Sequence, residues 1–142
     1  MVETVVGYDK PLPVPDLDTR PFWEACRDHE LRAQRCPACG RYRWPPQGVC
    51  PGCYQWNNEW VKLPETGKVV SFVVVHYVSV PAFAEDAPYA IANISIDGTD
   101  DVVQLTSNVI RVPWEEVKVG MPVRVVFDDV TPEATLPKFR PA

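Results

Sequence analysis

The chain has 142 residues, of which 46% are hydrophobic and 11% aromatic, and its formal net charge is −5. This composition indicates a folded domain with a substantial core and excludes an intrinsically disordered chain. No apolar run approaches the ~20 residues of a membrane-spanning helix, and residues 1–7 lack the basic and apolar regions of a signal peptide. We therefore expect a cytoplasmic protein with reduced cysteines, which favours metal binding over disulfides.

The N-terminal segment is expected to be an extended arm followed by a helix. Residues 1–17 contain three prolines and no amphipathic period, which is typical of an arm. Asp18 or Thr19 can cap a helix that ends near His29. Three residues at helical spacing would form the apolar patch of this helix: Phe22, Trp23 and Cys26. Cys26 is most simply a small buried residue.

Two Cys-x-x-Cys pairs follow the helix, and their members are Cys36, Cys39, Cys50 and Cys53. Each pair can form a short knuckle that turns two sulfurs inward, and the ten residues between the pairs suffice for a small hairpin. In a redox-active pair a strand would lead into the motif and a helix would follow, whereas proline and glycine here indicate turns. The spacing therefore predicts a zinc ribbon over residues 31–56, with iron as the alternative ion.

The remaining segment, residues 57–142, has the pattern of a small β-barrel. Its β-branched and alternating runs predict strands at 69–78, 89–96, 102–112 and 123–130, and residues 136–139 can close the set. A helical turn is expected at 113–117, and turns are expected at Gly67, Asp97-Gly98 and Gly120. The number and length of these strands fit an oligonucleotide/oligosaccharide-binding (OB) barrel.

Charge is unevenly distributed along the chain. Residues 20–43, here called the neck, contain six arginines and three acidic residues. The neck therefore carries a formal charge of +3, while the rest of the chain carries −8. An anionic ligand would prefer the neck. The alternative for any one of its arginines is an ordinary solvated position.

Several motifs occur together in an order that resembles one known family. In the first half they are Phe22–Cys26, Leu31–Gly40, Arg43–Pro46 and Cys50–Cys53, and in the second half Gly67–Phe72, Pro81–Phe83, Pro88–Tyr89, Val119–Val123 and Pro137–Pro141. This ordered set resembles the rubredoxin-like zinc-ribbon/OB-fold proteins associated with acyl-CoA metabolism. The resemblance implies a mainly β fold with an arm and helix over residues 1–30, a rubredoxin-like ribbon, and a C-terminal OB-type barrel with a tail.

The resemblance also implies a function. Such proteins are noncatalytic accessory subunits in hetero-oligomers with thiolase-type or lipid-transfer-protein-like enzymes, which cleave carbon–carbon bonds in acyl-CoA thioesters, and some relatives pair with hotdog-fold hydratases. Several of these complexes degrade steroid side chains or aromatic acids. The zinc would be structural and held by the four cysteines. One departure is His29-Glu30 at the helix exit, where many relatives have a glycine.

Two other classes of function are possible for a chain of this kind. An independent enzyme is disfavoured because His29 and His76 are the only histidines. His76 has no assignable nucleophile or orienting carboxylate, and His29 is expected to be an exposed residue at the helix end. A single-stranded nucleic-acid-binding module is the alternative for an OB barrel, but the barrel here lies in the acidic part of the chain.

The expected contacts with acyl-CoA or with the partner come from the neck and from one barrel loop. Arg27 and Arg32 could meet the coenzyme phosphates, because guanidinium groups suit phosphate contacts. Phe22, Trp23 and Phe83 could supply apolar cover, with core or interface packing as the alternative for each.

Overall fold

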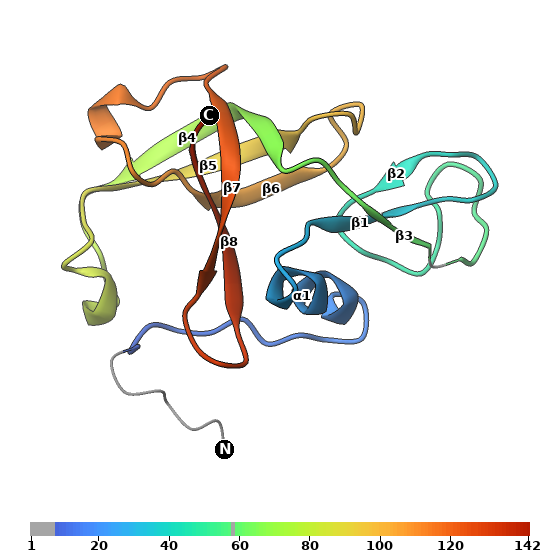
Figure 1. The fold of residues 1–142 in the computed structure, drawn as a ribbon, viewed down its shortest axis with the longest axis horizontal. Coiled ribbons are helices and arrows are strands. Elements are labelled where there is room, and N and C mark those ends of the chain that lie inside the picture. Colours follow the sequence, from blue (N-terminus) through green and yellow to red (C-terminus); the bar gives the residue numbers. More distant parts are fainter. Residues whose placement is uncertain (1–7, 58) are drawn as a thin grey trace.

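A computed structural model describes residues 8–57 and 59–142, and it divides into a small ribbon, a barrel-like sheet and a helix between them (Figure 1). Residues 8–17, in the predicted arm, contain no helix or strand and run beneath the barrel toward the helix. The rest of the predicted arm, residues 1–7, lies outside the described residues. No helix in the described ranges is long and apolar enough to span a lipid bilayer.

Helix α1 spans Arg20–Arg27 and starts where the sequence predicts. Two reciprocal hydrogen bonds between Asp16 and Thr19 stabilise the turn before the helix. The Asp16 carboxylate accepts from the Thr19 N–H at 2.8 Å, and the Thr19 hydroxyl accepts from the Asp16 N–H at 3.1 Å. Pro21 sits in the first turn, where its missing N–H costs no helical hydrogen bond. The buried face carries Phe22, Ala25 and Cys26.

The helix ends slightly before the predicted position because His29 adopts a left-handed conformation, with φ of 57°. The Glu30 N–H then donates to the Ala25 carbonyl at 2.9 Å, and the His29 N–H donates to the Cys26 carbonyl at 2.9 Å. These two bonds form a Schellman-type end, a motif that usually has glycine at the left-handed position. His29 therefore takes the glycine's place at the helix exit.

The ribbon contains a three-stranded antiparallel sheet in the order β2-β1-β3. Its strands are β1 (Arg32–Arg35), β2 (Tyr42–Arg43) and β3 (Trp60–Lys62). Strand β3 comes from the segment that the sequence assigns to the barrel, yet it pairs with β1 through Ala33 and Val61. The crossing from ribbon to barrel therefore follows Lys62.

The barrel half is a five-stranded antiparallel sheet in the order β6-β5-β4-β7-β8. Its strands are β4 (Thr66–Val75), β5 (Tyr89–Ile96), β6 (Gln104–Asn108), β7 (Pro122–Asp129) and β8 (Thr135–Pro141). Short 3-10 turns lie at η1 (Pro81–Phe83) and η2 (Trp114–Glu116). An isolated parallel bridge joins Val109, just after β6, to Phe139 on β8. The two edge strands of the sheet therefore approach each other through a single bridge. The arrangement is the predicted OB type.

One continuous core joins the three parts. Buried Ile94, Val123 and Phe139 of the barrel belong to the same apolar cluster as Leu31 and Cys26 beside the ribbon. Burial raises the pKa of the Cys26 thiol to about 12, consistent with the small buried residue predicted there. The helix thus fixes the ribbon against the barrel.

The prediction for Gly67 is wrong, because it lies inside β4 instead of in a turn. A Cβ at this position would come within 2.4 Å of the Ser95 carbonyl oxygen on β5. Glycine is needed here for close backbone approach, which is the other common reason for glycine in a strand. Gly98 and Gly120 lie in turns with φ of 76° and 86°, as predicted.

Candidate metal centre

The two Cys-x-x-Cys pairs form two equivalent knuckles. In the first, the Cys36 N–H donates to the Arg41 carbonyl at 2.8 Å and the Gly40 N–H donates to the Cys36 carbonyl at 2.8 Å. The second repeats this pattern with bonds of 3.0 Å from Cys50 to Gln55 and 2.8 Å from Tyr54 to Cys50. The sequence predicts these turns through their proline and glycine content.

The two knuckles differ at the residue that closes each turn. Gly40 has φ of 77° and Tyr54 has φ of 64°, so both occupy the left-handed region. Glycine adopts this conformation without steric cost, whereas tyrosine does not. The Tyr54 side chain is 77% exposed and so gains little from packing within this chain.

The four sulfurs converge on one point between the knuckles. All four Sγ atoms lie within 4.8 Å of one another. The Sγ atoms of Cys36 and Cys53, and those of Cys39 and Cys50, are 3.6 Å apart. Four thiolates around a tetrahedral zinc at about 2.3 Å would be separated by about 3.8 Å. These residues therefore fit a tetrahedral metal ion, and all four are free cysteines.

Amide groups favour the thiolate forms of Cys36 and Cys50. At Cys53 the Gln55 N–H acts in the same direction, but burial and contact with the other sulfurs outweigh it and raise the pKa of Cys53 to about 11. The Cys39 backbone N–H, assisted by the Asn57 side chain, lowers the pKa of the Cys36 thiol to about 6 although burial opposes this. The Cys53 backbone N–H lowers the pKa of Cys50 in the same way. Because metals bind the thiolate, this environment suits a metal ligand set.

Asn57 contributes a hydrogen bond to the metal centre that the sequence does not predict. Its Nδ2 donates to the Cys36 Sγ at 3.3 Å, across 21 residues of sequence. The only signal in the sequence is an amide side chain shortly after the last cysteine, which has no predictive value alone. The fold of the ribbon brings Asn57, which follows the second knuckle, next to Cys36 in the first knuckle.

The predicted contact residues lie at separate places. Phe22 is 7% exposed and belongs to the core. Its position fits core packing, the alternative to contact with acyl-CoA or a partner. Trp23 lines an apolar cavity of about 750 Å³ between the arm and the β7–β8 turn. Arg27 is exposed at the end of α1, and the Arg32 Nε donates to the Glu30 carboxylate at 2.9 Å. Contact between these residues and acyl-CoA or a partner remains a prediction.

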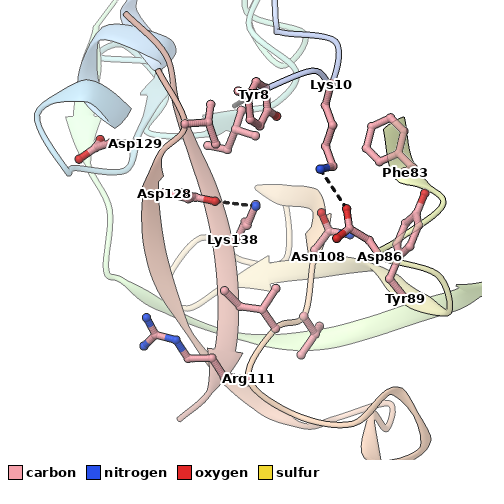
Figure 2. A pocket seen from close by; sticks show the side chains of 14 residues that line it. Tyr8, Lys10, Phe83, Asp86, Tyr89, Asn108, Arg111, Asp128, Asp129 and Lys138 are labelled. Atoms are coloured by element: carbon pink, nitrogen blue, oxygen red, sulfur yellow. Dashed lines mark hydrogen bonds and ion pairs between the residues drawn. The ribbon is translucent and has the colours of Figure 1, made fainter. Parts of the chain in front are cut away.

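Phe83 lines another cavity, of about 740 Å³, at the mouth of the barrel (Figure 2). Two lysine–aspartate ion pairs cross it, with Nζ–Oδ2 distances of 3.2 Å for Lys10–Asp86 and 2.6 Å for Lys138–Asp128. Lys10 belongs to the arm, so the arm forms part of the wall. Each of these lysines is paired with a carboxylate, so Arg111 is the one basic side chain among the described lining residues without an ion-pair partner.

The two histidines occupy unrelated surroundings. His76 follows β4 and contacts Trp114 edge to face, with ring centroids 5.2 Å apart. His29 is exposed at the helix exit, as predicted, and bonds to Asp129. Neither lies in the metal centre.

Family models match both halves of the chain. The model for the ChsH2 rubredoxin-like zinc ribbon domain matches residues 23–55, and the model for the ChsH2 C-terminal OB-fold domain matches residues 60–128. A solved structure, an Ltp2-ChsH2(DUF35) aldolase, superimposes with a TM-score of 0.81 at 33% identity, covering 91% of this chain and 98% of that chain.

The chain spans less than two thirds of the length of the curated relatives that it matches. A probable enoyl-CoA hydratase alpha subunit of Thermomonospora curvata is 35% identical over 134 residues, which are 94% of this chain and 40% of that protein. A DUF35 domain-containing scaffold protein of Methanocaldococcus jannaschii is 35% identical over 94 residues, which are 66% of this chain and 64% of that protein. The ribbon, the OB domain and the solved structure agree, and the chain belongs to the ChsH2/DUF35 family of zinc-ribbon and OB-fold proteins.

Proposed function

We propose that this chain is a noncatalytic accessory subunit that assembles with a thiolase-type, lipid-transfer-protein-like enzyme acting on acyl-CoA thioesters. The names of its relatives support both parts of this proposal, the acyl-CoA enzyme as partner and the scaffold role of this chain. They include an enoyl-CoA hydratase alpha subunit, a scaffold protein and an aldolase chain. Steroid side chains and aromatic acids are the acyl groups that the family resemblance suggests.

The observation that carries the proposal is an exposed, uncharged surface along β4 and the loop after it. Residues 69–84 contain no aspartate, glutamate, lysine or arginine. Within this segment Val73 is 60% exposed and Tyr77 is 96% exposed, while Val70 and Val80 are each 42% exposed. Exposed apolar patches of this kind mark protein interfaces.

The backbone of β4 points to the same conclusion. It pairs with β7 only through Thr66–Lys68, whereas its pairing with β5 continues to Val75. In the described part of the chain, no strand pairs with the other edge of residues 71–75. Proteins usually protect such edges with charges or proline. This edge has neither, and a partner subunit would cover it.

The metal centre supports a structural role in this subunit. Four thiolates would fill a tetrahedral coordination shell and leave no position for a catalytic water or a substrate. The zinc would hold the ribbon in shape, and the ribbon would position the helix and its neighbouring surface. Bond cleavage would then take place in the partner enzyme.

Co-purification tests the proposal. The chain is co-expressed with a candidate thiolase-type, lipid-transfer-protein-like enzyme, and the complex is isolated through a tag on that enzyme. We expect a stable complex from the wild type and its loss in Val73→Asp, because a charge would be buried at the interface. Val102→Asp is the matched control, since Val102 is 41% exposed on the β5–β6 turn. Turnover of acyl-CoA by the isolated chain, or equal assembly of both variants, would contradict the proposal.

A further inference from the structure

Arg43 is a buried arginine without a carboxylate partner. It lies on β2 with 1% of its surface exposed, and no carboxylate in the described ranges approaches it within ion-pair distance. Its Nη1 donates to the carbonyls of Gln47 at 2.8 Å and Asn57 at 2.9 Å. Its Nε is buried and has no hydrogen-bond partner among the described residues. A buried cation left unpaired in this way is costly unless a negative charge lies nearby.

Asn57 connects this guanidinium to the sulfur cluster. Its Oδ1 accepts from the Arg43 Nη2 at 2.7 Å, while its Nδ2 donates to the Cys36 Sγ at 3.3 Å. The reverse amide orientation would place N–H groups against the guanidinium and an oxygen against the thiolate. Both contacts would be repulsive, so the two neighbours fix the amide orientation.

We propose that Arg43 and Asn57 are positioning residues of the metal centre, in which Arg43 supplies the positive charge that offsets the bound cluster and Asn57 transmits its polarisation to Cys36. A divalent ion with four thiolates carries a net charge of about −2. Cys36 and Cys50 are each only 1% exposed, so water shields this side of the cluster little. A buried guanidinium one amide away supplies the missing counter-charge.

This assignment gives the neck arginines different roles. Arg43 belongs to the neck that carries +3, but it is almost completely buried. Hydrogen bonds and charges near ligating sulfurs tune both the affinity and the reduction potential of a thiolate-bound metal. The proposal therefore predicts electronic effects at the metal, which a purely packing role for Arg43 would not produce.

The test replaces zinc with iron and measures the Fe(III)/Fe(II) potential by protein electrochemistry. The reduced four-thiolate site carries one more negative charge than the oxidised site, so a nearby cation and an N–H···S bond stabilise the reduced form more. We expect Asn57→Asp, which keeps the acceptor for Arg43 but places a carboxylate oxygen against Cys36, to lower the potential. Arg43→Gln should lower it as well, while Arg43→Lys, which keeps the charge, should lower it less.

A second measurement uses zinc itself. Competition with a chelator should show metal affinity reduced roughly 10- to 100-fold in Asn57→Asp. Arg20→Gln, which removes an exposed arginine at the start of α1, is the matched charge control. If Arg43→Gln fails to fold, the nearly isosteric Asn57→Asp still decides the question. Potentials and zinc affinities of Asn57→Asp that match those of Arg20→Gln would overturn the proposal.

Discussion

The Nε2 atom of His29 lies 3.0 Å from each carboxylate oxygen of Asp129, and this contact ties the helix exit to the end of β7. The two residues are 100 positions apart in the sequence. The His29 ring also stacks on Phe127, with centroids 5.2 Å apart and planes inclined by 12°. These contacts offer a reason for histidine at a left-handed position that usually favours glycine.

Substitution of His29 should separate its backbone cost from its side-chain contacts. His29→Ala keeps the left-handed strain and loses both contacts, whereas His29→Gly loses the contacts but relieves the strain. Left-handed geometry costs a non-glycine residue about 1–2 kcal/mol. We therefore expect the glycine variant to be about 1 kcal/mol more stable than the alanine variant in urea unfolding. Equal stabilities would show that the backbone at residue 29 is unstrained.

Asp129 should make stability depend on pH in the acid range. Its pKa is lowered from the ordinary 3.8, first by the Thr135 hydroxyl and then by His29. A carboxyl with a lowered folded-state pKa stabilises the fold above its unfolded-state pKa and loses this contribution as pH falls through the folded-state pKa. The stability advantage of the wild type over Asp129→Asn should therefore be present at neutral pH, decline as pH falls below the ordinary pKa, and disappear below the lowered folded-state pKa. An advantage that is equally large in acid would contradict this.

Short-range patterns predicted much of the structure. The α1 start follows from Pro21 in its first turn, although the N-cap Thr19 makes no side-chain capping hydrogen bond, and the knuckles follow from cysteine spacing, because both depend on neighbours in the sequence. The Asn57–Cys36 and His29–Asp129 contacts join distant segments, so no local pattern reveals them. Gly67 shows a different limit. Glycine serves both turns and close strand approach, and only the register of β4 on β5 distinguishes the two.

The left-handed residues that close the knuckles should respond oppositely to substitution. Tyr54→Gly removes a left-handed tyrosine that is mostly exposed, so the metal-loaded protein should gain about 0.5–1 kcal/mol. Gly40→Ala should lose about 1 kcal/mol through backbone strain. A Cβ at Gly40 has its nearest neighbour, the Arg35 Nη2, at 3.9 Å, so steric clash adds nothing. Thermal unfolding of the zinc forms measures both, and destabilisation by Tyr54→Gly would show that its side chain contributes to the fold.

Metal removal should unfold the ribbon. We expect one zinc per chain, and binding at such sites contributes on the order of 10 kcal/mol to folding. Cys39→Ser should therefore lower the metal content and the solubility, since it removes one of the four converging sulfurs. Elemental analysis and amide exchange of residues 31–56 measure the two effects. Cys26→Ser is the control, because Cys26 lies outside the sulfur cluster and should leave the zinc content unchanged.

Charge reversal on the neck distinguishes acyl-CoA from nucleic acid as the ligand of the assembled protein. Arg27 is exposed on the last turn of α1, whereas Arg32 is paired with Glu30. Arg27→Glu is therefore the cleaner variant, because a glutamate at position 32 would also repel Glu30. If Arg27 meets coenzyme phosphates, loss of one charge-assisted bond worth roughly 1.5–3 kcal/mol should raise the KM of the complex for acyl-CoA about tenfold or more, with unchanged zinc content.

The competing OB function makes the opposite prediction for the same variant. A single-strand binder would hold oligonucleotides with a steep salt dependence, which Arg27→Glu would weaken. The barrel belongs to the part of the chain that carries −8, so we expect no tight binding of oligonucleotides by the wild type at physiological salt. Fluorescence anisotropy with a labelled single strand measures this. Tight, salt-sensitive binding together with an unaltered KM for acyl-CoA in the variant complex would establish the nucleic-acid function instead.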